Sequence, residues 1–119
     1  MCFVTTVQEL IHDLDLTVFH LEDGGRTVSG GCYCGDLLSW VMGRAPADVV
    51  WLTIMSNVNV AAVATLTDLA CVILTEDVEP DPPLLQKARL QGVNLLGTSR
   101  STYRCAVSLS GLLDANVRS

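Results

Sequence analysis

The chain has 119 residues, of which 50% are hydrophobic and 17% charged, with a formal net charge of −6 and a sequence pI near 4.5. This length and apolar content fit one domain with a sizeable core, while the acidic charge and the single lysine, Lys87, argue against a nucleic-acid partner. The apolar runs are shorter than the roughly eighteen residues of a membrane-spanning helix, and no signal peptide is evident, so we expect a soluble, cytoplasmic protein with no membrane partner.

The first predicted element is an amphipathic helix. Residues Thr6 to Glu9 have the capping-box pattern, and apolar residues then recur at helical spacing as far as Leu14. A short strand at residues 16–21 follows, and it ends in the acidic, glycine-rich turn of residues 22–25.

A glycine-rich stretch from Gly24 to Gly43 is the most distinctive part of the sequence. Its glycines allow positive φ angles and the close approach of another group. Asp36 is expected to cap a two-turn helix that reaches Met42 and is closed by Gly43. We interpret the stretch as a binding feature, although a tight turn or bulge at residues 30–31 with no ligand fits equally well.

Three strand–helix units complete the predicted fold. Their strands are expected at residues 49–54, 70–74 and 93–96, and their helices at 57–66, 82–91 and 101–113, with caps at Ser56 or Asn57 and at Asp81, and a stop at Gly92. The helix at 57–66 has hardly any polar face, which places it either inside the domain or at a subunit interface.

Alternation of buried strands and helices indicates an α/β fold. We expect a single three-layer domain, with a mostly parallel or mixed sheet between helices. The domain is assigned to residues 1–114, with a frayed tail at 115–119. The apolar surface of a chain with so little charge also predicts a homodimer.

Polar residues follow the predicted strands, where open α/β sheets bind ligands. Hydroxyls, amides, glycines and two arginines suit a phosphate or carboxylate. Taken singly, these residues are also ordinary helix caps, and the arginines are equally well explained as surface ion-pair partners. The candidate ligand-binding residues are Arg26, Thr27, Gly30, Gly31, Ser56, Asn57, Asn59, Thr98, Ser99, Arg100, Ser101 and Thr102.

Neither catalysis nor metal binding is supported by a motif. The chain has only two histidines and no G-x-S-x-G, Walker A or G-x-G-x-x-G pattern, so we expect no enzyme, although a base at Asp36 or Glu76 is left open. The pair Cys32-x-Cys34 lacks the spacing of zinc sites, and the odd total of five cysteines favours scattered reduced thiols. We therefore expect no metal and no cofactor.

Several short stretches resemble the stand-alone DRTGG-domain proteins, and the match covers nearly the whole chain. They are Arg26-Thr27-Val28-Ser29-Gly30-Gly31, Cys34 to Gly43, Trp51 to Ile54, Asn57 to Ala64 and Lys87 to Val93. One departure is that Gly25 stands where the motif has Asp, and Val28-Ser29 separates Thr27 from the glycines; Asp23 is a nearby substitute.

The resemblance implies an α/β domain similar to the N-terminal domain of HPr kinase/phosphorylase. Related domains occur in CBS-containing inorganic pyrophosphatases and in some phosphotransacetylases, where they are regulatory and dimer-forming, and those pyrophosphatases respond to adenine nucleotides. The resemblance thus implies a non-catalytic module that senses an adenine nucleotide or another phosphorylated small molecule. The alternative is an assembly subunit of an iron-sulfur redox system of the hydrogenase type, since stand-alone members are often encoded near such proteins.

Overall fold

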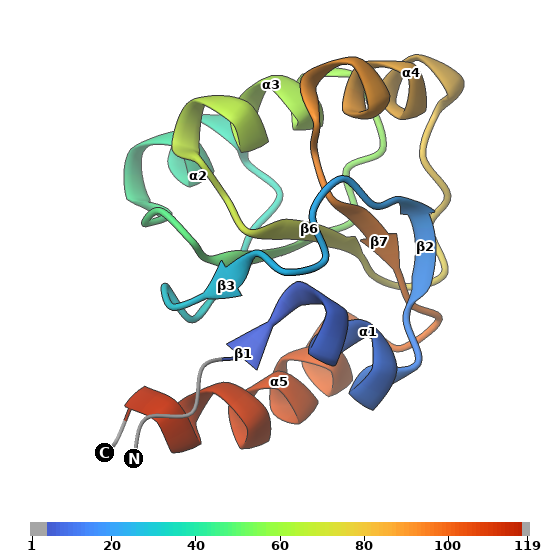
Figure 1. Ribbon diagram of the computed structural model, residues 1–119. Coiled ribbons are helices and arrows are strands. Elements are labelled where there is room, and N and C mark those ends of the chain that lie inside the picture. Colours follow the sequence, from blue (N-terminus) through green and yellow to red (C-terminus); the bar gives the residue numbers. More distant parts are fainter. Residues whose placement is uncertain (1–4, 118–119) are drawn as a thin grey trace.

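The computed structural model describes residues 5–117, which form a five-stranded mixed sheet between two layers of helices (Figure 1). Its strands are β1 (Thr5–Thr6), β2 (Thr17–His20), β3 (Thr27–Val28), β4 (Cys32–Cys34), β5 (Val50–Thr53), β6 (Cys71–Leu74) and β7 (Leu95–Gly97). Its helices are α1 (Val7–Leu14), α2 (Leu38–Arg44), α3 (Asn59–Thr67), α4 (Pro82–Gln91) and α5 (Thr102–Val117). The predicted fold class is confirmed.

The main sheet has the strand order β2-β7-β6-β5-β4. Strands β4 to β7 are parallel, and β2 pairs antiparallel with β7 at one edge. Strands β1 and β3 form a separate antiparallel ribbon. Every residue of β5 and β6 is buried, as their near-continuous apolar sequences predict for strands covered on both faces.

Helices α2, α3 and α4 cover one face of the sheet, and α1 and α5 cover the other (Figure 1). Helices α2, α3 and α4 each connect one parallel strand to its neighbour in the sheet, and the strand order proceeds in one direction. Right-handed crossovers therefore bring all three helices to the same face. Trp51, Val72 and Leu74 pack under these helices. Leu52 and Ile73 point the other way, towards α1 and α5.

Helix α3 lies between α2 and α4 and is covered on most sides within the domain. Val60, Ala61, Val63 and Ala64 are buried, while Leu66 on the outer side is 72% exposed. The apolar sequence of this helix is therefore explained largely by packing inside the domain. No helix in the described part of the chain is long and apolar enough to cross a membrane.

Local signals predicted some helix ends correctly. The capping box of Thr6 and Glu9 is present, with the Glu9 amide donating to the Thr6 hydroxyl and the Glu9 carboxylate accepting from the Thr6 amide. Gly92 ends α4 in the left-handed conformation, with φ of 70°. Helix α5 begins one residue later than expected and continues past Leu113 to Val117.

The predicted caps of α2 are wrong, whereas that of α3 is present. Asp36 does not cap α2, because its Oδ1 atom instead accepts from the Thr53 hydroxyl at 2.8 Å and from the Ile54 amide at 2.9 Å. Gly43 lies inside α2 and does not close it. At the start of α3, Val58 already has helical dihedral angles, and the Asn57 side chain accepts from the Asn59 amide at 2.9 Å, so the predicted cap at Asn57 is present.

Asn94 links the connection between β2 and β3 to the core. Its Oδ1 atom accepts from the amides of Glu22 and Asp23 at 2.8 and 2.9 Å. Its Nδ2 atom donates to the carbonyls of Asp23 and Ala70, each at 3.0 Å. The side chain is buried, and four hydrogen bonds satisfy it fully. Sequence reasoning treated this residue as an ordinary strand position.

Candidate ligand site at the carboxyl ends of the parallel strands

The predicted site residues lie at opposite ends of the parallel strands. The segment carrying Arg26, Thr27, Gly30 and Gly31 lies at the amino ends of the parallel strands, where the Gly30 amide donates to the carbonyl of Asp48 just before β5. The remaining eight residues lie in loops after β5 and β7 or at the starts of the helices that follow. The expectation that the arginine-glycine segment joins the carboxyl-end loops is therefore not met.

Arg26 is held by two carboxylates at this amino edge. Its Nε and Nη2 atoms donate to Asp48 Oδ1 at 3.1 and 2.7 Å, and Nη2 also contacts the Asp68 carbonyl at 2.7 Å and its carboxylate at 3.3 Å. Burial by itself lowers the pKa of Arg26, but the bond to Asp48 and the charge of Asp68 outweigh it and raise the pKa. The ion-pair interpretation thus accounts for Arg26, with no contribution from Asp23, whose carboxylate accepts from the Gly25 amide.

A hollow opens at the carboxyl edge, where two connections diverge. The chain leaves β6 towards α4 on one face of the sheet and leaves β7 towards α5 on the other. Ligands gather at such points in open α/β sheets because the diverging chains leave a crevice. Its volume is about 390 Å³, and it is lined by Leu14, Asp15, Thr17, Asp77, Thr98, Ser99 and Arg100.

The two diverging loops are joined through their backbones. The Glu76 amide donates to the Arg100 carbonyl at 2.8 Å, and the Asp77 amide donates to the Thr98 carbonyl at 3.0 Å. To make these bonds, Glu76 and Asp77 adopt left-handed backbone conformations, with φ of 61° and 62°. That conformation costs about 1 kcal/mol or more for each residue that is not glycine. The loop that borders the hollow is therefore held in a strained shape by its neighbour.

Arg100 brings unused hydrogen-bond donors to the hollow. Its Nη1 atom donates to the carbonyl of Leu14 at the end of α1 and lies 3.5 Å from the Thr98 hydroxyl. Within residues 5–117, no protein acceptor is found for its Nε and Nη2 atoms. A guanidinium group with free donors is well suited to a phosphate or carboxylate oxygen.

The start of α5 is occupied by the protein's own side chains. The Glu76 carboxylate accepts from the Thr102 amide at 2.9 Å, and the Ser101 hydroxyl accepts from the Arg104 amide at 3.1 Å. The Thr102 hydroxyl also pairs with that of buried Thr75 at 2.7 Å. Ser101 caps α5, and Thr102 is held by Glu76 and Thr75, which leaves Ser99 and Arg100 as the accessible residues of this loop; Thr98 lines the hollow but is buried.

Ser56, Asn57 and Asn59 do not line the hollow. The Ser56 hydroxyl donates to the Asp81 carboxylate at 3.2 Å, and the Asn57 side chain accepts from the Asn59 amide at 2.9 Å. These are local turn and cap contacts. Leu14, Asp15 and Thr17 do line it, and sequence reasoning missed them because no local signal placed β2 beside β7.

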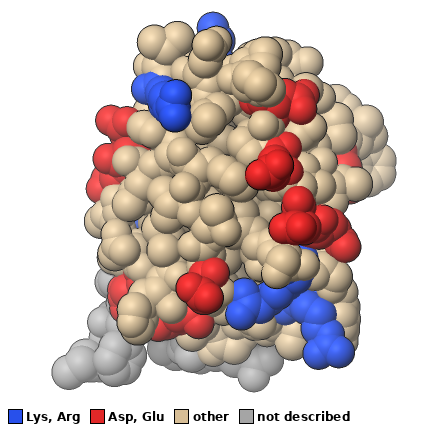
Figure 2. Space-filling view, turned by 90° about the vertical axis from the view of Figure 1, so that its right-hand side faces the viewer, with Lys and Arg blue, Asp and Glu red and all other residues tan. Residues whose placement is uncertain are grey.

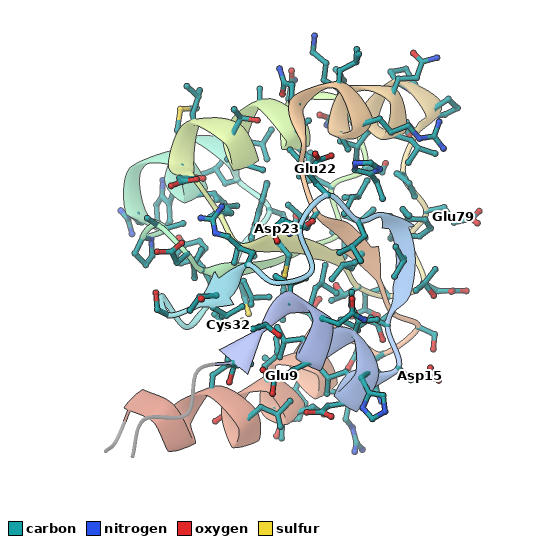
Figure 3. The ribbon with its side chains drawn as sticks, viewed as in Figure 1. Glu9, Asp15, Glu22, Asp23, Cys32 and Glu79 are labelled. Carbon is teal, nitrogen blue, oxygen red and sulfur yellow. The ribbon has the colours of Figure 1, made fainter. Side chains whose placement is uncertain are left out.

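Two acidic side chains border the hollow. Asp15 and Asp77 are exposed on its rim, and Glu79 lies on the same side of the molecule (Figure 3). Figure 2 shows this side, with acidic groups spread over it, a group of basic side chains at its lower right and further basic side chains near its top. Carboxylates accept hydrogen bonds from sugar hydroxyls and coordinate divalent cations, and they repel an anion that carries no bound cation.

The comparisons with known proteins concern the fold. No family model matches the sequence, and no curated protein sequence matches it. The fold is that of a DRTGG-like α/β domain. It is similar to a solved structure of the CBS and DRTGG domains of the regulatory region of Clostridium perfringens pyrophosphatase, complexed with the activator diadenosine tetraphosphate, with a TM-score of 0.75 over 95% of this chain. Sequence identity is 9%, and the match spans about half of that structure, 49%.

Proposed function

We propose that this chain is a non-catalytic regulatory domain that senses a phosphorylated small molecule, of which an adenine nucleotide is the first candidate. The observation that carries the proposal is the hollow at the diverging connections, with the free guanidinium donors of Arg100 beside it. The likeness of the fold to a regulatory region that was crystallised with diadenosine tetraphosphate supports the choice of ligand class.

The lining residues divide into two chemical groups. Arg100 together with the hydroxyls of Thr98 and Ser99 would bind phosphate oxygens. Asp15 and Asp77 would accept hydrogen bonds from ribose hydroxyls or hold the divalent cation that accompanies a polyphosphate. Because of these carboxylates, we expect tighter binding with Mg²⁺ than without it. The comparisons give no support to the alternative of an iron-sulfur assembly subunit.

Substitution of Arg100 tests the proposal. Calorimetry and thermal unfolding with AMP, ATP and diadenosine tetraphosphate, each with and without Mg²⁺, should reveal at least one ligand. At a hundredfold excess over its Kd, that ligand should stabilise the protein by about 2.7 kcal/mol. Arg100→Ala should weaken binding by about ten- to a hundredfold, since a charge-assisted hydrogen bond contributes about 1.5–3 kcal/mol.

Arg104→Ala is the matched control, because Arg104 is exposed on the next turn of α5 and does not line the hollow. It should bind the nucleotide as the wild type does. An equal loss of affinity in the two variants would show that only the overall positive charge matters and that Arg100 does not contact the ligand. The absence of any heat or thermal shift with all three nucleotides would refute the proposed ligand class.

We also propose that the chain forms a homodimer through the outer surface of α3 and α4. Leu66 and Leu90 are 72% and 81% exposed there, and a hydrogen bond of 3.1 Å between Thr65 and Gln91 joins the two helices next to them. Light scattering should give twice the chain mass for the wild type and the chain mass for Leu66→Glu. A monomeric wild type would contradict this proposal without affecting the nucleotide site.

A further inference from the structure

Strand β4 places two cysteines side by side at an edge of the sheet. Residues two apart on a strand point to the same face, so Cys32 and Cys34 share a face that Tyr33 does not. In the parallel register they pair with Val50 and Leu52, whose side chains point towards the α1 and α5 layer. Both cysteines are exposed, because β4 has no further strand on its outer side.

The two neighbouring thiols affect each other's pKa. A hydrogen bond from Cys32 lowers the pKa of Cys34 to about 7, against the opposing effects of burial and of the Asp36 charge. The same interaction, together with partial burial of a side chain that still has an exposed side, raises the pKa of Cys32. Cys71 and Cys105 differ, because burial raises their pKa values to about 12 and about 11.

We propose that Cys32 and Cys34 form a dithiolate site for one soft, thiophilic cation of the Cu⁺ type. Thiolate ligands select such ions, and Cu⁺ is stable with two of them. Within residues 5–117 no group of three or more His, Cys, Asp or Glu side chains could hold a metal, so this pair offers two ligands and not the four of a structural zinc site. On binding, both sulfurs bond to the ion and whatever protons they still carry pass to solvent, with no change of oxidation state.

A disulfide is a poorer use of the same pair. Two residues of an extended strand span about 6.6 Å between Cα atoms, near the upper limit for a disulfide, whose Cβ atoms must also approach to about 3.8 Å. A bridging ion relaxes this requirement, because each sulfur needs to reach only the ion. Spacing in the sequence disfavoured a metal at Cys32-x-Cys34, but the placement of both thiols on one exposed face of a strand favours it.

The dithiol is distinct from the nucleotide hollow. It lies on β4, whereas the hollow lies beside β2 and β7 at the other edge of the sheet. Figure 3 shows Asp15 at the right of the molecule and Cys32 left of its centre. Arg100→Ala should therefore leave Cu⁺ binding unchanged, which separates failure of this proposal from failure of the proposed function.

The test is anaerobic titration of the reduced full chain with Cu⁺ against a chromogenic Cu⁺ chelator, with native mass spectrometry to count ions. We expect one Cu⁺ per chain. Cys32→Ser and Cys34→Ser should each weaken binding at least tenfold, while the matched controls Cys2→Ser and Cys105→Ala should retain wild-type affinity. Serine is close in size to cysteine and both sites are exposed, so both variants should fold, which circular dichroism will verify.

A second measurement needs no variant. Iodoacetamide should modify Cys34 of the wild-type protein, as peptide mapping will show, and the singly modified chain should no longer take Cu⁺ from the chelator. Failure of the unmodified wild type to compete with the chelator would overturn the proposal. Unchanged affinity in Cys32→Ser and Cys34→Ser would overturn it as well, as would loss of the ion in Cys2→Ser.

Discussion

Gly30→Ala is expected to destabilise the protein by about 3 kcal/mol, a large part of the 5–15 kcal/mol typical of a domain. A Cβ atom at this position would contact the Ala47 carbonyl oxygen, lie 2.9 Å from the Val49 amide nitrogen and 3.0 Å from the Asp48 carbonyl carbon. All three are backbone atoms, so no side-chain rotation relieves the clash. The glycine is needed because two backbone segments meet here, and the Gly30 amide donates to the Asp48 carbonyl at 3.1 Å.

Urea unfolding will measure this cost, and Gly43→Ala is the matched control. Gly43 lies inside α2, and a Cβ atom there would meet nothing within 4 Å. Its substitution should stabilise the protein by about 0.5–1 kcal/mol, because alanine loses less backbone entropy in a helix. If Gly30→Ala is as stable as the wild type, the close approach of the two segments is incorrect.

Asn94→Ala is the second substitution with a large expected effect, about 2–4 kcal/mol of lost stability. It removes four hydrogen bonds at once and leaves the amides of Glu22 and Asp23 and the carbonyl of Ala70 without this partner, while the Asp23 carbonyl keeps its bond from the Arg26 amide at 3.2 Å. Each buried polar group left unsatisfied costs about 1–3 kcal/mol, and water reaching the partly exposed connection of residues 22–23 will reduce the sum. Chemical unfolding will measure the loss.

Asn94→Asp separates hydrogen bonding from packing, because its side chain has nearly the same shape. The carboxylate keeps the two acceptor contacts but places an oxygen against the carbonyls of Asp23 and Ala70, where the amide nitrogen was a donor. It should be at least as destabilising as Asn94→Ala at pH 7. A loss below about 1 kcal/mol in both variants would show that Asn94 does not hold the connection to the core.

The sequence predicted those parts of the fold whose signals are local. A capping box at Thr6, proline at the first position of α4 and glycine after it each act within one helix turn. Long apolar runs likewise predicted the buried strands β5 and β6. Strands β1, β3 and β4 have only two or three residues each, which is too short for a periodic pattern, and they were not predicted.

The candidate site was predicted in part for the same reason. Residues 98–100 follow a recognisable strand, so the rule that ligands bind beyond strand ends identified them. The contribution of Asp15 and Thr17 depends on the antiparallel pairing of β2 with β7, which joins residues far apart in sequence. At Asp36 a local signal was misleading. Aspartate is a common helix cap, but here its carboxylate accepts hydrogen bonds from Thr53 and Ile54, which are distant in sequence.

The two helical layers have different consequences for the order of folding. The face under α2, α3 and α4 is built from consecutive segments, so its contacts close short loops. The other face needs α1 and α5, which come from opposite ends of the described chain and meet over Leu52 and Ile73. Closing so long a loop costs more entropy and is slower. We therefore expect the core under α2, α3 and α4 to form first, and the core under α1 and α5 to form once α5 has docked.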